Sequence, residues 1–322
     1  MTHGSAVPPP VTVVMDAAAA WLPRRMAAVE SRLEELVAGH GDALAADAGA
    51  TLAAGGKRLR PMLVLLCAGR DHGQEAERAA TAVELVHMAT LVHDDVLDAA
   101  PLRRGKPTVV ATSGRERATA VGDLLFSRAF AEITDGRQVA LLAGTSVALA
   151  RGELMQRRDA FDLGLPAERY LERCRLKTGR LFSCACTIGR PGADGNGELE
   201  EFGREIGLAF QLLDDVLDVT GPPERTGKAR GTDLLDGTVT LPLILARERD
   251  PELGSLELRS LDQNAAEEAC DRIAATGVLD EVRGGAREQV EAAKAMLDGA
   301  ALDAEQRELL LLVADGVVER YS

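Results

Sequence analysis

The apolar residues of this chain lie in long runs, mostly of Ala, Leu and Val, which are separated by short stretches rich in Gly, Pro and charged residues. Ala, Leu, Glu and Arg favour helix, and no segment shows the alternation of apolar and polar residues typical of a half-buried strand. We expect helices at 17–38, 42–52, 62–68, 77–97, 116–133, 137–159, 167–189, 198–219, 241–247, 265–276, 279–297 and 304–320. No boundary of composition and no short-period repeat interrupts this pattern, so it predicts one all-α domain over residues 15–322.

The stretches between the expected helices carry recognisable start and stop signals. Asp16 and Asp303 are plausible N-caps, and Pro61 stands in a first turn, where its missing N–H costs nothing. The segments 70–74, 101–107, 191–197 and 221–231 are expected to be loops. Residues 1–14 lack a basic region followed by an apolar stretch, so we expect a disordered lead-in and no signal peptide.

Composition narrows the class of protein. The chain has 322 residues, 46% of them hydrophobic but only 3% aromatic, and a formal net charge of −14. This acidic balance argues against a nucleic-acid or anionic-membrane binder, and the absence of any run of about 18 apolar residues predicts no membrane span. The five cysteines are odd in number and the chain is too long to need disulfides, which indicates reduced thiols in the cytoplasm.

The pentapeptide Asp-Asp-Val-Leu-Asp occurs twice, at Asp94–Asp98 and at Asp214–Asp218, each time inside an apolar, helix-like run. Residues at i and i+4 share a helical face, about 6 Å apart along the axis, so the outer aspartates of each copy can act together while the middle one is turned away. A pair of carboxylates suits Mg²⁺, which takes its other ligands from water and phosphate. An exposed acidic face is the alternative, and the repetition disfavours it. The candidate metal ligands are Asp94, Asp95, Asp98, Asp214 and Asp218.

Basic residues accompany both acidic copies. Acidic helix ends followed by basic loops are the arrangement that a metal–diphosphate complex needs, because Arg and Lys neutralise the phosphate charge that the metal leaves. Each cation taken singly is more often a surface residue, but the set favours a site. No Gly-x-x-x-x-Gly-Lys-Ser/Thr loop is present, which disfavours a nucleotide triphosphatase. The basic candidates are Lys57, Arg60, Arg103, Arg104, Lys177 and Lys228.

Taken in order, these motifs resemble the trans-isoprenyl diphosphate synthase, or polyprenyl synthetase, family. The resemblance spans residues 52–246 and is closest to medium- and long-chain bacterial members. The motifs that carry it are Gly56-Lys57-Arg58-Leu59-Arg60-Pro61, the run from Glu84 through His87 to Asp98, Leu102-Arg103-Arg104-Gly105, Gly122-Asp123-Leu124-Leu125-Phe126, Lys177-Thr178, the run from Phe210 to Asp218, Gly231-Thr232-Asp233 and Thr240-Leu241-Pro242.

The resemblance implies antiparallel helices around a deep central cavity, usually in a homodimer, and condensation of an allylic diphosphate with isopentenyl diphosphate. It implies about three Mg²⁺ ions per active site, two of them on Asp94 and Asp98 and a third on Asp214. The implied contacts of the allylic diphosphate, or catalytic residues, are Lys177, Thr178, Gln211, Lys228 and Arg103. The implied contacts of isopentenyl diphosphate are Lys57, Arg60, His87 and Arg104.

Two positions bear on variation within the family. Thr238 stands where many members carry lysine, and some long-chain members look similar there. Ala89 and Thr90, one turn before the first acidic copy, are small where short-chain enzymes tend to carry an aromatic residue, which favours a medium or long product. Alternatives are a geranylgeranyl diphosphate synthase, a class I terpene cyclase and a non-catalytic partner subunit. The two complete acidic copies count against the last two.

Overall fold

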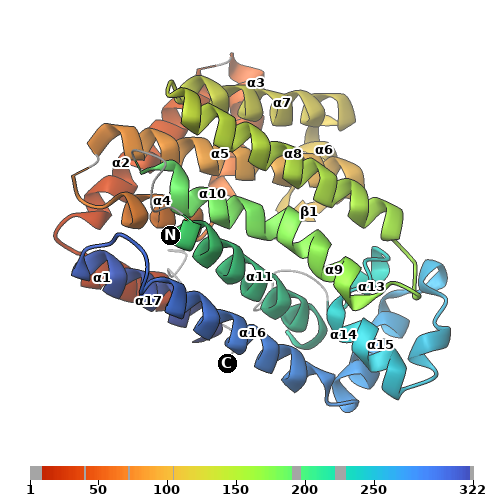
Figure 1. The fold of residues 1–322 in the computed structure, drawn as a ribbon. Helices are drawn as coiled ribbons and strands as arrows, with labels where there is room; N and C mark the ends of the chain where they lie inside the picture. The colour runs from red at the N-terminus through yellow and green to blue at the C-terminus, as the bar shows by residue number, and fades with distance from the viewer. Residues whose placement is uncertain are drawn as a thin grey trace.

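The computed structural model describes residues 9–39, 41–71, 73–103, 105–190, 197–221 and 230–319. Helices account for nearly all of this structure, as the sequence predicted, and several of the longest run side by side (Figure 1). The α-helices are α1 Pro9–Ala17, α2 Leu22–Ala38, α3 Asp42–Ala53, α4 Leu59–Ala68, α5 Gly73–Asp98, α6 Val109–Ser113, α7 Arg115–Glu132, α8 Gly136–Asp159, α9 Ala167–Cys174, α10 Arg180–Ile188, α11 Gly197–Thr220, α13 Thr232–Leu235, α14 Leu241–Arg249, α15 Gln263–Ala275, α16 Val278–Met296 and α17 Ala304–Glu319. Two 3₁₀ turns, η2 Leu253–Ser255 and η3 Leu258–Ser260, complete the C-terminal region.

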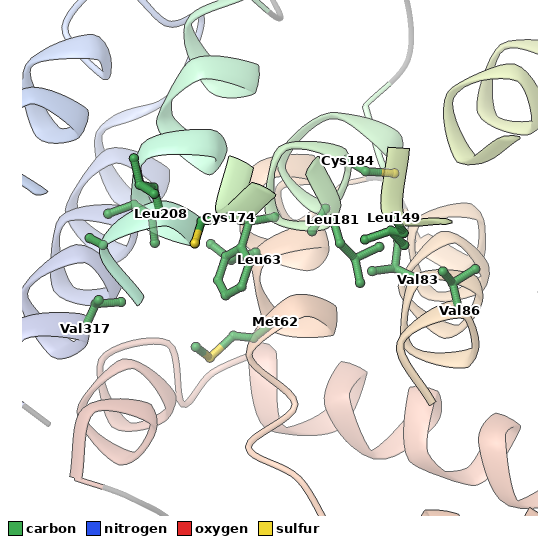
Figure 2. Close-up of a cluster of buried hydrophobic side chains, with 14 of the residues drawn as sticks. Met62, Leu63, Val83, Val86, Leu149, Cys174, Leu181, Cys184, Leu208 and Val317 are labelled. Atoms are coloured by element: carbon green, nitrogen blue, oxygen red, sulfur yellow. The ribbon is translucent and has the colours of Figure 1, made fainter. Parts of the chain in front are cut away.

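The core forms around α10, whose residues 181–188 are all buried. This helix packs against α4, α5, α8 and α11, and α16 covers the other side of α11. These elements each contribute buried apolar side chains to one cluster, among them Met62 of α4, Val86 of α5, Leu149 of α8 and Leu208 of α11 (Figure 2). The helices that carry the two acidic copies, α5 and α11, are therefore held in place through α10.

The N-terminal segment differs from the expected disordered lead-in. Residues 9–14 belong to α1, which packs against α17, and Val14 is fully buried there. The indole Nε1 of Trp21 donates a hydrogen bond to Glu305 at 3.3 Å, joining the same two ends of the chain. A turn at 18–21 divides the helix expected at 17–38, and α2 restarts with Pro23 in its first turn. Residues 1–8 of the expected lead-in lie outside the described residues.

Several short elements were not predicted, including α6, α13 and two structures near the expected site. The loop at 101–107 contains a short antiparallel pair, β1 Leu102–Arg103 and β2 Lys106–Pro107. The helix expected at 167–189 is three elements, because the π-helical turn η1, Arg175–Gly179, separates α9 from α10. A π-helical turn widens the backbone by one residue and often marks a functional site, and this one carries Lys177 and Thr178.

The cysteines agree with the expectation of reduced thiols, because all five are free and buried. No helix among the described ranges is both long enough and apolar enough to cross a membrane. Two predicted site residues, Arg104 and Lys228, lie outside the described residues.

Candidate active site

The first acidic copy occupies the last turn of α5, and its aspartates have different partners. Lys177 Nζ on η1 lies 3.6 Å from Oδ2 of Asp94. Asp95 is buried, and its Oδ1 accepts a hydrogen bond from Nε of Arg103 on β1 at 2.8 Å and forms an ion pair with Nη2 of the same guanidinium at 2.7 Å. The middle aspartate thus turns toward the β1–β2 hairpin and away from the partner of Asp94, as the helical spacing predicted.

α8 supplies a third wall to this end of α5. Glu153 accepts a hydrogen bond from Lys177 Nζ, and Gln156, one turn further along α8, accepts a second at 3.2 Å. Arg157 donates to Glu153 at 3.0 Å and also pairs with Asp98. One ionic network therefore joins α5, α8 and the π-helical turn.

Burial sets the ionisation of this network. Desolvation raises the pKa of Asp94 to about 6, with Glu153 and Asp98 adding repulsion and Lys177 opposing both effects. Burial lowers the pKa of Lys177, but the carboxylates of Asp94 and Glu153 outweigh it and hold that pKa above its ordinary value. The ammonium therefore stays charged while the half-buried Asp94 carboxylate is only partly solvated, a condition that favours binding of a further cation.

A glycine allows α8 to approach the π-helical turn. A Cβ built on Gly152 would lie 2.8 Å from the backbone nitrogen and 3.0 Å from Cα of Lys177, which is closer than real side chains come. Because only glycine fits there, α8 can place Glu153, the next residue, within hydrogen-bonding reach of the Lys177 ammonium.

The second acidic copy lies at the C-terminal end of α11. Asp214 is exposed and Asp215 is buried. Asp218 Oδ2 accepts a hydrogen bond from the backbone nitrogen of Asp233 at 3.2 Å, at the start of α13. Asp214 and Asp218 again differ from the aspartate between them, because Asp215 faces the protein interior.

Asp215 belongs to a chain of hydrogen bonds that reaches the π-helical turn. Its Oδ2 accepts from the Tyr170 hydroxyl at 2.5 Å, and its Oδ1 accepts from Nε2 of Gln211 at 2.7 Å. Oε1 of Gln211 in turn accepts from the Thr178 hydroxyl at 2.7 Å. Desolvation, aided by the nearby Asp233 carboxylate, raises the pKa of Asp215 to about 8, yet Oδ1 remains an acceptor for Gln211 whether or not Oδ2 carries a proton.

One of the residues expected to hold isopentenyl diphosphate, His87, lines an open cavity at this end of the molecule. The same lining also includes Gly55, Arg58, Asp95 and Arg103. Lys57 and Arg60 lie on the segment that begins at Gly55, and the Arg60 guanidinium stacks over the Phe182 ring with its Cζ 4.6 Å from the ring centroid. The structure thus groups His87 with Arg103, while Arg60 faces the core helix α10.

Sequence reasoning missed four side chains of this site and set aside a fifth. Each is polar and lies on a helix that carries or contacts an expected site residue. The one sequence signal that could have indicated them is the spacing of Glu153 and Gln156, three residues apart on α8, which places both on one helical face. The four missed residues are Glu153, Gln156, Arg157 and Tyr170, and the residue set aside was Asp215.

The donor set fits Mg²⁺ better than a transition metal. In the part of the chain that the structure describes, no three His, Cys, Asp or Glu side chains converge as ligands of one ion. Mg²⁺ does not require such a cage, because one or two carboxylates can hold it while water and substrate phosphates complete an octahedron. Asp94 and Asp98 on α5, and Asp214 and Asp218 on α11, are two such oxygen pairs.

Comparison with known proteins adds independent information. The polyprenyl synthetase family model matches residues 42–276. The chain is 42% identical over 230 residues to component 2 of the heptaprenyl diphosphate synthase of Geobacillus stearothermophilus, an alignment that covers 69% of this chain and 72% of that protein. It is 36% identical over 281 residues to the octaprenyl diphosphate synthase of Escherichia coli, covering 83% and 86% respectively.

Solved structures agree with these matches. A polyprenyl synthase from Caulobacter crescentus, crystallised with calcium and isoprenyl diphosphate, superimposes with a TM-score of 0.87 at 34% identity, covering 97% of this chain and 98% of that one. The heptaprenyl diphosphate synthase of Staphylococcus aureus superimposes with a TM-score of 0.86 at 30% identity, covering 94% and 99%.

Proposed function

We propose, from the premise that the chain belongs to the polyprenyl synthetase family and is a trans-polyprenyl diphosphate synthase, that its two acidic helix ends hold Mg²⁺ against an allylic diphosphate. Asp94 and Asp98 would hold two ions, and Asp214 with Asp218 a third. The observation that carries this proposal is the network in which the desolvated Asp94 lies beside Lys177. When bound, Mg²⁺ supplies positive charge to the diphosphate oxygens.

The protein's own cations complete the neutralisation of the leaving group. Lys177, Arg103 and Lys228 are proposed to contact the allylic diphosphate, so that charge on the departing oxygen is stabilised as the C–O bond breaks. Asp95 is kept as a candidate metal ligand, although its bonds to Arg103 also support a role in aiming that guanidinium. Closure of the site against water would protect the allylic cation.

The second substrate would lie across the cavity that His87 and Arg103 line. Lys57, Arg60, His87 and Arg104 are proposed to hold its diphosphate. The isopentenyl double bond then attacks the allylic cation and forms the new C–C bond. The resulting tertiary cation loses a proton, which we assign to the released diphosphate.

A medium or long product is proposed. Ala89 is fully buried and small, and the Thr90 hydroxyl turns back to the carbonyl of His87 at 2.7 Å, so neither position offers a bulky barrier. Relatives named for heptaprenyl, octaprenyl and geranylgeranyl products leave the length open. Ala89→Phe should shorten the product. An unchanged product from a stably folded variant would contradict the assignment, and Thr90→Phe offers a second test at a half-buried position.

One feature supports a homodimer, and another supports a location in the cytoplasm. Val147 and Leu154 lie seven residues apart on one face of α8 and are 61% and 69% exposed, which is unusual for large apolar side chains. A relative that is named as a synthase component makes a different partner subunit the alternative. Five buried free thiols are in keeping with a reducing compartment.

The decisive experiment is incubation with Mg²⁺, isopentenyl diphosphate and dimethylallyl, farnesyl or geranylgeranyl diphosphate, with products sized by mass spectrometry. Elongation identifies the preferred primer and the product length. Release of a cyclic hydrocarbon without elongation would indicate a terpene cyclase. A purified chain that elongates no primer alone would indicate a partner-dependent subunit.

A further inference from the structure

A buried hydrogen-bonded link runs from α9 to the π-helical turn and ends on a residue proposed to be catalytic. Tyr170 and Asp215 are 0% and 3% exposed, and Thr178 is also buried. The bonds are Tyr170 to Asp215 at 2.5 Å, Gln211 to Asp215 at 2.7 Å and Thr178 to Gln211 at 2.7 Å.

The link has a direction. Nε2 of Gln211 donates to Oδ1 of Asp215, so the carbonyl oxygen of Gln211 is the atom that faces Thr178. The Thr178 hydroxyl must then donate to Gln211. The hydrogen of that hydroxyl is therefore committed, and the oxygen lone pairs point away from Gln211.

Close packing fixes the relative positions of the three elements that this hydrogen-bonded link joins. α11 and the π-helical turn meet at two glycines, where a Cβ on Gly207 would lie 2.9 Å from Cα of Gly179. α9 contacts α11 as well, and the two run alongside each other in Figure 1. Because the three elements cannot slide apart, removal of one hydrogen bond would be felt at the other end of the link.

We propose that Tyr170 is a positioning residue which, through Asp215 and Gln211, fixes the orientation of the Thr178 hydroxyl so that its oxygen faces the allylic cation. This rests on the proposed function and on the catalytic role that the family resemblance implies for Thr178. A lone pair directed at a developing positive charge stabilises it, whereas an O–H hydrogen directed at it does the opposite. Without the Tyr170 hydroxyl, Asp215 can turn and Gln211 can flip its amide, which frees Thr178 to rotate.

A purely structural role for Tyr170, holding α9 against α11, makes a different prediction. Structural loss would lower the amount of folded enzyme regardless of which residue stands at position 178. A positioning role requires the Thr178 hydroxyl, so a double-mutant cycle separates the two explanations.

The test measures kcat and both KM values of Tyr170→Phe, Thr178→Val and the double variant, with a melting curve for each. Tyr170→Phe should lower kcat about tenfold with KM values changed less than about twofold, and should cost less than about twofold in the Thr178→Val background. In a Thr178→Ser background, which keeps a hydroxyl at position 178, Tyr170→Phe should again lower kcat by the full factor. An equal loss in both backgrounds, or a wild-type rate for Thr178→Val, would overturn the proposal.

Two controls sharpen the result. Thr187→Val removes a buried hydroxyl that bonds only to backbone carbonyls of α10, and it should leave kcat nearly unchanged in either background. Asp215→Leu breaks the link between Tyr170 and Gln211, and it replaces Tyr170→Phe in the cycle if the tyrosine variant folds poorly. Elongation by the unmodified enzyme in the same assay separates a failure of this link from a failure of the proposed function.

Discussion

Nζ of Lys177 lies 3.6 Å from Oδ2 of Asp94, so the cation expected on the diphosphate and the carboxylate expected on the metal belong to one ionic network before either ligand arrives. The network contains three carboxylates, from Asp94, Asp98 and Glu153, and the cations of Lys177 and Arg157. Its excess negative charge favours binding of a metal ion. Its cations lie near the position that a diphosphate bound to this metal would occupy.

The pKa of Asp94 predicts a gain of stability when this carboxyl is neutralised in metal-free protein. Its folded-state pKa of about 6 exceeds the ordinary value of 3.8, so ionisation above about pH 6 costs stability that protonation restores as the pH falls. Asp94→Asn should therefore raise Tm by a few degrees at about pH 7.5 in EDTA, and by less at about pH 5, where the wild-type carboxyl is itself protonated. An equal difference at both pH values would contradict this account, and turnover should be lost throughout.

Gly152→Ala should disturb the geometry of the site, although Gly152 is not itself a proposed ligand or catalytic residue. The new Cβ would meet the backbone of Lys177, so α8 or the π-helical turn must move, at a cost of about 1–3 kcal/mol. We expect a lower Tm and a loss of kcat. Gly284→Ala in α16 is the matched control, because its Cβ would meet nothing within 4 Å, and better helix propensity should stabilise it by up to about 1 kcal/mol. Equal effects of the two substitutions would refute the packing argument.

Arg157 pairs with Asp98, so we expect it to compete with a metal ion for that carboxylate. Arg157→Gln should strengthen Mn²⁺ or Mg²⁺ binding by about two- to fivefold, because an exposed ion pair of up to about 1 kcal/mol no longer opposes it. Calorimetric titration without substrate measures this directly. Arg158→Gln, at the exposed neighbouring position, should leave binding unchanged. Weaker metal binding by the Arg157 variant would show that the guanidinium assists the site.

The exposed face of α8 predicts the oligomeric state. If Val147 and Leu154 lie in a subunit interface, Leu154→Glu should bury an unpaired charge there and shift the enzyme toward monomer in size-exclusion chromatography with light scattering. Ala292→Glu, on the exposed side of α16, should not change the molar mass. A wild-type protein that is monomeric at micromolar concentration would dismiss the homodimer.

Sequence patterns predicted the helices and the acidic ends well because both depend on local spacing. The i, i+4 argument correctly separated Asp95 from the face of Asp94, since helix geometry alone decides it. The residues that act across helices escaped prediction. Glu153 becomes relevant only because Gly152 lets α8 approach η1, and that contact joins positions about 25 residues apart along the chain.

The π-helical turn and α1 were hidden for related reasons. Residues 175–179 carry no sequence signal that separates a π-helical turn from an α-helix, and the turn contacts both α8 and α11 in the folded protein. The segment at 9–14 is too short to form a stable helix alone and gains its order from α17, almost the whole chain away. Tertiary contacts of this kind produce no periodic pattern in the sequence from which they could be predicted.

The pairing of α1 with α17 also constrains the order in which the chain can fold. The two helices come from opposite ends of the described residues, and Trp21 bonds to a residue 284 positions away. Because contacts at such sequence separation carry a large loop-closure cost, we expect this pair to form late, after the helices around α10. Until the pair forms, the face of α1 that contains Val14 is an exposed apolar surface, which makes the incompletely folded chain prone to aggregation.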